Sequence, residues 1–215
     1  MGYLTYDRVI CAVYMKIMEE RIWMEKEKWY ILQTWKEQEY EAEALLDFAV
    51  SKSLYSCCRI LRKFKMFRVG GAFRMVEDMM FPGYLFIRTA YPKQLQKELK
   101  KSREFPQFFS FGKNEVGQDE LIPISEKDLG FLQNVCGTQL QFPMGVTDII
   151  LGENRQILKA SGALENYVNQ IVRLNLHKRF AVAEIPLFNR NQTVLFGIRL
   201  EQDFSLLAER STNTA

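Results

Sequence analysis

Side chains that commonly perform catalysis are scarce in this sequence, and their spacing matches no familiar active site. The chain has one histidine, His177, which is followed by Lys178 and Arg179 and has no nucleophile near it in sequence. A histidine activates a nucleophile only within hydrogen-bond reach of it. The pair Gly70-Gly71 lacks the Lys-Ser/Thr of a phosphate-binding loop and the third glycine of a dinucleotide-binding loop. We therefore predict that the protein is not an enzyme and uses no cofactor.

Cysteine usage indicates a reducing compartment and argues against a metal centre. Structural zinc sites group Cys and His ligands at short spacings, often as C-x-x-C pairs. No such pair occurs among the cysteines, which are Cys11, Cys57, Cys58 and Cys136. Adjacent cysteines bridge each other only with considerable strain, so Cys57 and Cys58 are not expected to pair. Free thiols of this kind predict a cytoplasmic protein without a metal site.

Basic residues cluster in one segment of the sequence. The segment RILRKFKMFRVGGAFR, residues 59–74, has no acidic residue, and its basic residues are Arg59, Arg62, Lys63, Lys65, Arg68 and Arg74. Such clusters bind the phosphates of nucleic acids, but they also occur on solvated hairpins. The excess of 29 Lys and Arg over 26 Asp and Glu leaves a net charge of only +3. Both interpretations therefore stay open from the residues alone.

Aromatic side chains gather beside a sharp bend in MMFPGYLFIR, residues 79–88. The Pro82-Gly83 pair is typical of a turn, yet a strand-forming run follows it directly. Successive side chains of a strand point to opposite faces, so Tyr84 and Phe86 share one face, opposite to that of Leu85. A core strand does not require this lead-in, so the aromatic face needs a further explanation.

Hydrophobic periodicity divides the first part of the chain into helices and strands. Ala42 and Leu46 fall on one face of a helix, and Gly70-Gly71 is typical of a hairpin turn. Ser125 and Asp128 have the spacing of a helix N-terminal capping box. The predicted elements are a strand over 29–33, a helix over 38–50, hairpin strands over 61–69 and 72–78, a strand over 84–88, a helix over 92–101 and a helix between 125 and 137.

The pattern changes after residue 137, where Pro143 and Gly145 interrupt the periodicity. Short strands at regular spacing are typical of a small barrel. They are expected over 156–159, 170–174, 181–185 and 193–198. The predicted organisation is an N-terminal appendage over 1–27, an α/β domain over 28–137, a linker over 138–147, a β-barrel over 148–205 and a flexible tail over 206–215.

Several motifs, in this order, resemble the NusG family of bacterial transcription elongation factors. They are WYILQ, an amphipathic helix, a basic hairpin with Gly-Gly, FPGYLF, SREFPQFFSFG, IPIS and a barrel containing HKRFAVAEIPLFNR. The resemblance extends over residues 29–204, and FPGYLF at 81–86 is similar to the family's most recognisable motif. HKRFAVAEIPLF and GIRLE are similar to the LoaP branch, a set of operon-specific antitermination factors.

The resemblance implies an α+β fold and a macromolecular partner. The N-terminal domain would be an antiparallel sheet flanked by helices, and the C-terminal domain a KOW barrel of the SH3-like type. Family members dock an apolar surface on the β′ clamp helices of RNA polymerase and favour processive elongation or antitermination. The implied polymerase contacts are Phe81, Tyr84, Phe86, Tyr30 and, toward the β subunit, Gln96 and Lys97.

The resemblance also implies binding roles for several basic residues and for one loop. The hairpin would reach non-template or upstream DNA through Arg62, Lys63, Lys65 and Arg68. The barrel would bind a structured RNA, such as an RNA hairpin, through Arg173, Lys178, Arg179 and Arg190. The loop of relatives that contacts a ribosomal protein or a termination factor corresponds to Leu187, Phe188, Asn189 and Arg190.

This sequence departs from the family pattern in its barrel. Asn189 and Asn169 stand where the family has glycine, and Ala163 replaces a usual proline. Asparagine tolerates a left-handed backbone better than most residues, so we expect both turns to survive. The alternative is a KOW-containing RNA-binding protein that acts in translation or ribosome assembly. Such a protein has no need of an aromatic docking surface, and neither interpretation involves a membrane.

Overall fold

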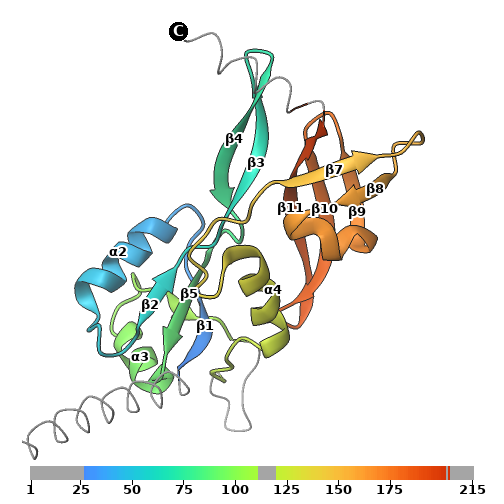
Figure 1. Cartoon of the computed structure of the whole chain (residues 1–215). Helices are drawn as coiled ribbons and strands as arrows, with labels where there is room; N and C mark the ends of the chain where they lie inside the picture. The colour runs from blue at the N-terminus through green and yellow to red at the C-terminus, as the bar shows by residue number, and fades with distance from the viewer. Residues whose placement is uncertain (1–26, 111–119, 202, 204–215) are drawn as a thin grey trace, which may run out of the picture.

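An antiparallel sheet of four strands organises the N-terminal half of the computed structural model, which describes residues 27–110, 120–201 and 203 (Figure 1). The central strands set Ile31 opposite Phe86 and confirm the two strands predicted there. Their aromatic and β-branched residues suit a pleated, buried surface. In spatial order the strands are β2 (Cys57–Arg59), β5 (Tyr84–Thr89), β1 (Lys28–Gln33) and β6 (Gln107–Phe108).

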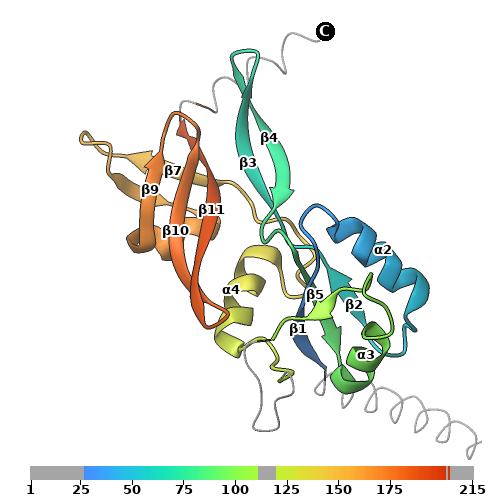
Figure 2. The same cartoon turned by 180° about the vertical axis from the view of Figure 1, so that it is seen from behind.

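Helices cover both faces of this sheet (Figures 1 and 2). On one face, α2 (Glu39–Ala49) and α3 (Pro92–Leu99) bury Leu85 and its neighbours. On the other, α4 (Glu126–Cys136) packs toward Phe86. The period-2 alternation of β5 sends its side chains to two opposite faces, as predicted, and each face is buried in a separate core.

Local signals in the sequence determine where these helices begin and end. The Ser125 hydroxyl accepts a hydrogen bond from the Asp128 backbone N–H at 3.1 Å, which confirms the predicted cap of α4. Gly137 ends that helix with φ 82°, a left-handed conformation that glycine adopts without strain. Pro92 stands at the first helical position of α3, where its missing N–H is not needed.

The basic segment forms the predicted hairpin of β3 (Arg62–Val69) and β4 (Ala72–Met79). Gly70 and Gly71 make the turn with φ 57° and 83°, so both central residues are left-handed. Turns of this kind match the right-handed twist of paired strands. The hairpin projects from the N-terminal sheet toward the C-terminal half (Figure 1).

The C-terminal half is a curled sheet of five strands, called the barrel below, in the order β8-β7-β11-β10-β9. Its strands pair antiparallel except for β7 and β11, which are parallel. Leu164, Ala181 and Phe196 are fully buried inside it. The elements are β7 (Thr147–Leu151), β8 (Ile157–Ala160), the 3-10 helix η1 (Gly162–Gln170), β9 (Ile171–Asn175), β10 (Phe180–Leu187) and β11 (Arg190–Leu200).

The two halves share one hydrophobic core. Phe86 of the sheet, Leu132 of α4 and Phe188 of the barrel belong to the same cluster of buried residues. The connecting segment is also paired, because the Met144 backbone N–H donates to the Arg62 carbonyl oxygen at 2.8 Å. Helix α4 therefore lies between the sheet and the barrel (Figure 2).

Some elements differ from the sequence prediction. Strands β2, β6 and β7 were not predicted. β2 and β6 are too short to show alternation, and β7 buries the polar Thr147 together with Ile149 while Ile150 is 48% exposed. The left-handed turn expected at Asn169 is absent from the described chain, because this residue lies in η1 with a negative φ. The predicted appendage over 1–27, except residue 27, and the predicted tail over 206–215 lie outside the described residues.

Candidate functional site

The Pro82-Gly83 bend is held by a buried carboxylate. Glu39, in the first turn of α2, is fully buried, and its Oε1 accepts a hydrogen bond from the Gly83 backbone N–H at 2.5 Å. The Gly83 carbonyl oxygen accepts from the Thr34 N–H at 2.9 Å, and Gly83 has φ 87°. These bonds connect the bend to α2 and to the end of β1. The chain can therefore enter β5 immediately after Phe81.

Three aromatic rings meet on the α4 side of the sheet. The ring centroids of Phe81 and Phe86 are 6.0 Å apart, and both rings also contact Phe188, at 5.6 and 6.1 Å. Rings at such separations gain about 0.5–1.5 kcal/mol per pair beyond the burial of their area. The third ring belongs to the barrel, at the turn between β10 and β11. The barrel thus inserts one anchor into the N-terminal domain.

The turn that carries this anchor has an unusual backbone. Phe188 and Asn189 have φ 56° and 59°, so both are left-handed. The expected tolerance of asparagine is confirmed at Asn189, but Phe188 is a bulky residue for which this conformation costs on the order of 1–3 kcal/mol. Its backbone N–H donates to Oδ2 of Asp128 at 3.1 Å in a buried bond. The left-handed residues close the hairpin between β10 and β11, and the bond to Asp128 fixes this turn against the N-terminal domain.

Tyr84 lies at the margin of the same contact and is half-buried. Its hydroxyl oxygen accepts a hydrogen bond from Nη2 of Arg190 at 3.1 Å. The Tyr84 and Phe109 rings pack edge to face at 5.6 Å, and the Arg190 guanidinium lies 5.1 Å from the Phe109 ring centroid. Phe81, Tyr84 and Phe86, called the aromatic face below, are therefore all contacted by the barrel.

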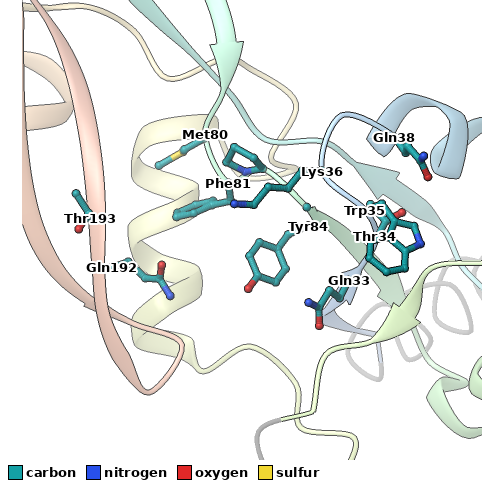
Figure 3. A pocket seen from close by; sticks show the side chains of 12 residues that line it. Gln33, Thr34, Trp35, Lys36, Gln38, Met80, Phe81, Tyr84, Gln192 and Thr193 are labelled. Atoms are coloured by element: carbon teal, nitrogen blue, oxygen red, sulfur yellow. The ribbon is translucent and has the colours of Figure 1, made fainter.

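A cavity of about 770 Å³ opens beside this contact, between the bend and strand β11 (Figure 3). Tyr84 and Phe81 line it from the N-terminal domain, and Gln192 and Thr193 line it from the barrel. Polar and apolar groups thus face each other across the opening. The barrel contacts the aromatic face through Phe188 and Arg190 but stands away from the bend at Gln192 and Thr193.

The structure brings together only part of the predicted polymerase-contact set. Phe81, Tyr84 and Phe86 lie side by side, whereas Tyr30 points to the opposite face of the sheet, where its ring meets Phe108 at 5.7 Å. Gln96 and Lys97 are on α3, which covers that opposite face. Alternation along β1 explains the position of Tyr30, since Trp29 and Ile31 are the residues on the α4 side.

The hairpin presents only some of its basic side chains to solvent. Lys63 is buried and donates to the Met79 carbonyl oxygen at 2.6 Å, and burial lowers the pKa of its ammonium group. Arg62 pairs with Glu77, and Lys65 with Asp78, each at 2.8 Å. Arg68 is exposed and has its Nε near the Gly71 carbonyl oxygen, at 3.4 Å.

The basic residues of the barrel are similarly divided. Arg173, Lys178 and Arg190 are exposed, but Arg179 is buried and donates to both carboxylate oxygens of Asp203 at 2.7 and 2.8 Å. Burial tends to raise the pKa of Asp203, yet the hydrogen bonds from Arg179 and from the Leu200 N–H, together with the nearby positive charges of Arg179 and Arg199, lower it. The Arg179 guanidinium is thus a structural group in this arrangement and is not offered to a nucleic acid.

Sequence reasoning missed two groups that join the domains. Asp128 was identified only as part of a helix cap, although its side chain also accepts the Phe188 N–H. Gly197 was not singled out, yet a Cβ there would lie 2.6 Å from the Phe64 carbonyl oxygen. The only signal for either was residue type, because the partners are distant in sequence.

Within residues 27–110, 120–201 and 203, no three Cys, His, Asp or Glu side chains gather in a way that suits a metal ion. None of the helices in these ranges has the length and apolar character that a bilayer crossing needs.

Comparison with known proteins gives a family match for the N-terminal domain. Residues 27–132 match the family model NusG, described as "Transcription termination factor nusG". No curated protein matches the chain. This chain is similar to a solved structure described as "Domain interaction in Thermotoga maritima NusG", with 18% sequence identity and a TM-score of 0.41. The matched region covers 80% of this chain and 93% of the Thermotoga maritima chain.

Proposed function

This chain belongs to the NusG family of transcription factors, and we propose that it binds RNA polymerase and promotes processive elongation or antitermination at specific operons. Proteins of this family bind RNA polymerase in general. In this chain we assign the polymerase contact to the aromatic face. The observation that supports this assignment is that aromatic rings of the N-terminal sheet contact a separate domain, the barrel.

The aromatic face has the properties of a docking surface. Phe81 and Phe86 provide apolar area, and Tyr84 provides a ring with a polar end. Large aromatic anchors of this kind supply most of the binding energy of protein interfaces. A pair of amphipathic helices, such as the β′ clamp helices, offers the complementary apolar ridge. Contact with them holds the polymerase clamp closed on DNA, provided that the closed enzyme is bound more tightly than the open one.

The barrel occupies this surface in the present arrangement. The Phe188 ring lies against Phe81 and Phe86, so a polymerase helix and the barrel cannot contact both rings at once. Burying a phenylalanine side chain stabilises by roughly 1.5–3 kcal/mol. Polymerase binding must therefore offset the loss of this contact. The apparent affinity for polymerase equals the affinity of the open form multiplied by the fraction of molecules that are open.

Departure of the barrel would also uncover the turn between β10 and β11. The left-handed residues Phe188 and Asn189 form a two-residue turn that is closed by the pairing of Leu187 with Arg190, so the turn persists without the N-terminal domain. The free barrel loop, Leu187 to Arg190, then becomes available to a second partner, such as a ribosomal protein or a termination factor.

Contacts beyond the aromatic face complete the proposal. Gln96 and Lys97 on α3 would serve a second polymerase contact, toward the β subunit, on the opposite side of the domain. Arg62, Lys65 and Arg68 of the hairpin would approach non-template or upstream DNA. The carboxylates of Glu77 and Asp78 already compensate two of these charges, so Arg68 is the strongest candidate.

Binding to core RNA polymerase tests the proposed surface. Phe188→Asn removes the apolar anchor while asparagine retains a left-handed turn, so it provides an open background. In that background Tyr84→Ala should weaken binding about tenfold, as expected for an aromatic hot spot. Tyr40→Ala is the matched control, because Tyr40 is exposed on α2 and outside the face. Equal affinities for the two variants would exclude the aromatic face as the docking surface.

A further inference from the structure

A second cleft lies where the β3–β4 hairpin meets the barrel, away from the aromatic face. Its volume is about 380 Å³, within the ~300–1,000 Å³ range of small-ligand pockets. Both domains contribute to it. The lining residues are Lys65, Met66, Phe67, Arg68 and Phe73 from the hairpin, and His177, Lys178, Phe180 and Leu195 from the barrel.

Close packing between the domains defines the walls of this cleft. Strands β3 and β11 approach so tightly that a Cβ on Gly197 would lie 2.6 Å from the Phe64 carbonyl oxygen. Below the opening, the Arg179 guanidinium lies 4.7 Å from the Phe73 ring centroid and is fixed by Asp203. The cleft thus exists only while hairpin and barrel are together.

Unpaired positive charge surrounds the opening. Arg68 from the hairpin and Lys178 from the barrel are both exposed, and neither forms an ion pair within the described chain. His177 is exposed beside them, and Lys65 pairs with Asp78. None of the described lining residues is acidic. The cleft therefore favours an anionic ligand held from two sides.

Aromatic rings line the same space. Phe67 is 56% exposed on the hairpin side, and Phe180 lies half-buried on the barrel side. Aromatic rings together with cations along a groove are the features that bind single-stranded nucleic acids, because bases stack on the rings while phosphates meet the charges. A duplex keeps its bases stacked inside and offers none to such a pocket.

We propose that this cleft binds single-stranded nucleic acid, with one unstacked base between the hairpin and the barrel and the flanking phosphates on Arg68 and Lys178. The inference rests on the proposed nucleic-acid role of the hairpin and extends it. Neither domain alone forms the site. A bound strand therefore bridges the two domains and favours their closed arrangement, since a ligand stabilises the state that binds it.

Fluorescence anisotropy with the full chain tests the cleft. The probes are labelled oligonucleotides of about 12 nucleotides, a length suited to one binding groove, as single-stranded DNA, as RNA of the same sequence and as the DNA duplex. We expect the single strands to bind more tightly than the duplex. The ratio of DNA to RNA affinity identifies which strand the cleft prefers.

Single-charge variants localise the binding. Arg68→Ala and Lys178→Ala should each raise Kd about threefold to tenfold and lower the slope of log Kd against log salt by about 0.7, the value for one lost phosphate contact. Lys159→Ala is the matched control, because Lys159 is exposed on β8 and outside the cleft. Phe188→Asn, which weakens the contact between the domains without touching the cleft, should also weaken binding.

The results of these binding measurements distinguish a shared cleft from binding by the hairpin alone. If Arg68→Ala weakens binding while Lys178→Ala and Phe188→Asn do not, the hairpin binds nucleic acid alone and the shared cleft is wrong. If the duplex binds as tightly as the single strand, no base enters the cleft, and the inference is again wrong. If Arg68→Ala has no effect either, the nucleic-acid role of the hairpin fails too. Polymerase binding by the aromatic face is judged separately by the Tyr84→Ala comparison.

Discussion

At the scale of single residues, the aromatic face depends on groups that are not aromatic. Glu39 is fully buried at the start of α2, where its carboxylate benefits from the helix dipole and accepts the Gly83 N–H. Its Oε2 has no hydrogen-bond partner among the described residues. Burying a carboxylate with an unpaired oxygen costs free energy. The hydrogen bond to the Gly83 N–H offsets part of this cost and stabilises the bend.

Removing this carboxylate should disturb the bend. Glu39→Ala leaves the buried Gly83 N–H without a partner, so we expect the free energy of unfolding in urea to fall by about 2 kcal/mol. Glu41→Ala is the control on the same helix, because Glu41 is exposed and its loss should change stability by less than about 0.5 kcal/mol. Equal stability of the two variants would show that the bend does not need Glu39.

Cys136 predicts a specific pH dependence. The residue is fully buried, and burial raises the pKa of its thiol to about 12. Above the unfolded-state value of roughly 8.5 the unfolded chain loses this proton first, so the contribution of Cys136 to stability falls as the pH rises. The difference in unfolding free energy between wild type and Cys136→Ala should shrink by up to about 1.4 kcal/mol per pH unit above that value. A difference that stays constant from pH 8 to pH 10 would contradict this burial.

Among the helices, strands and turns, those that depend on neighbouring residues were predictable from the local sequence. The turn glycines Gly70 and Gly71, the cap at Ser125 and the alternation of β5 each depend on neighbours within a few residues. Strands such as β2 exist because a partner strand is present, and three residues are too few to show a period. Strand β7 was missed for a related reason, since the polar Thr147 is among its buried residues and its pairing with β11 is not visible in the sequence.

Gly197 tests how closely β3 and β11 are packed. Gly197→Ala places a Cβ 2.6 Å from the Phe64 carbonyl oxygen, so the strands must shift, and overpacking of this kind costs roughly 1–3 kcal/mol. Gly130→Ala is the matched control, because this helical glycine has open space around it and alanine favours helices by about 0.8 kcal/mol. The two variants should therefore shift the midpoint of urea unfolding in opposite directions. Shifts of equal sign and size would contradict the close approach.

At the scale of the whole molecule, the candidate site was only partly predictable. Alternation placed Tyr84 and Phe86 on one face, but the covering group is Phe188, whose backbone bonds a residue 60 positions earlier. The bond between Arg190 and Tyr84 spans 106 positions. Periodicity carries no information about contacts at such separations. Nor does residue type, because a phenylalanine rarely adopts the left-handed turn that Phe188 forms.

The affinity of core RNA polymerase for wild type and for Phe188→Asn shows whether the barrel covers the polymerase-binding surface. Small-angle X-ray scattering provides the control, because the variant should show a larger radius of gyration if the barrel has left the N-terminal domain. We expect the opened variant to bind polymerase at least about tenfold more tightly, since it no longer loses the Phe188 contact on binding. If the opened variant binds polymerase no better than wild type, the barrel does not cover the polymerase-binding surface, and that part of the account is wrong.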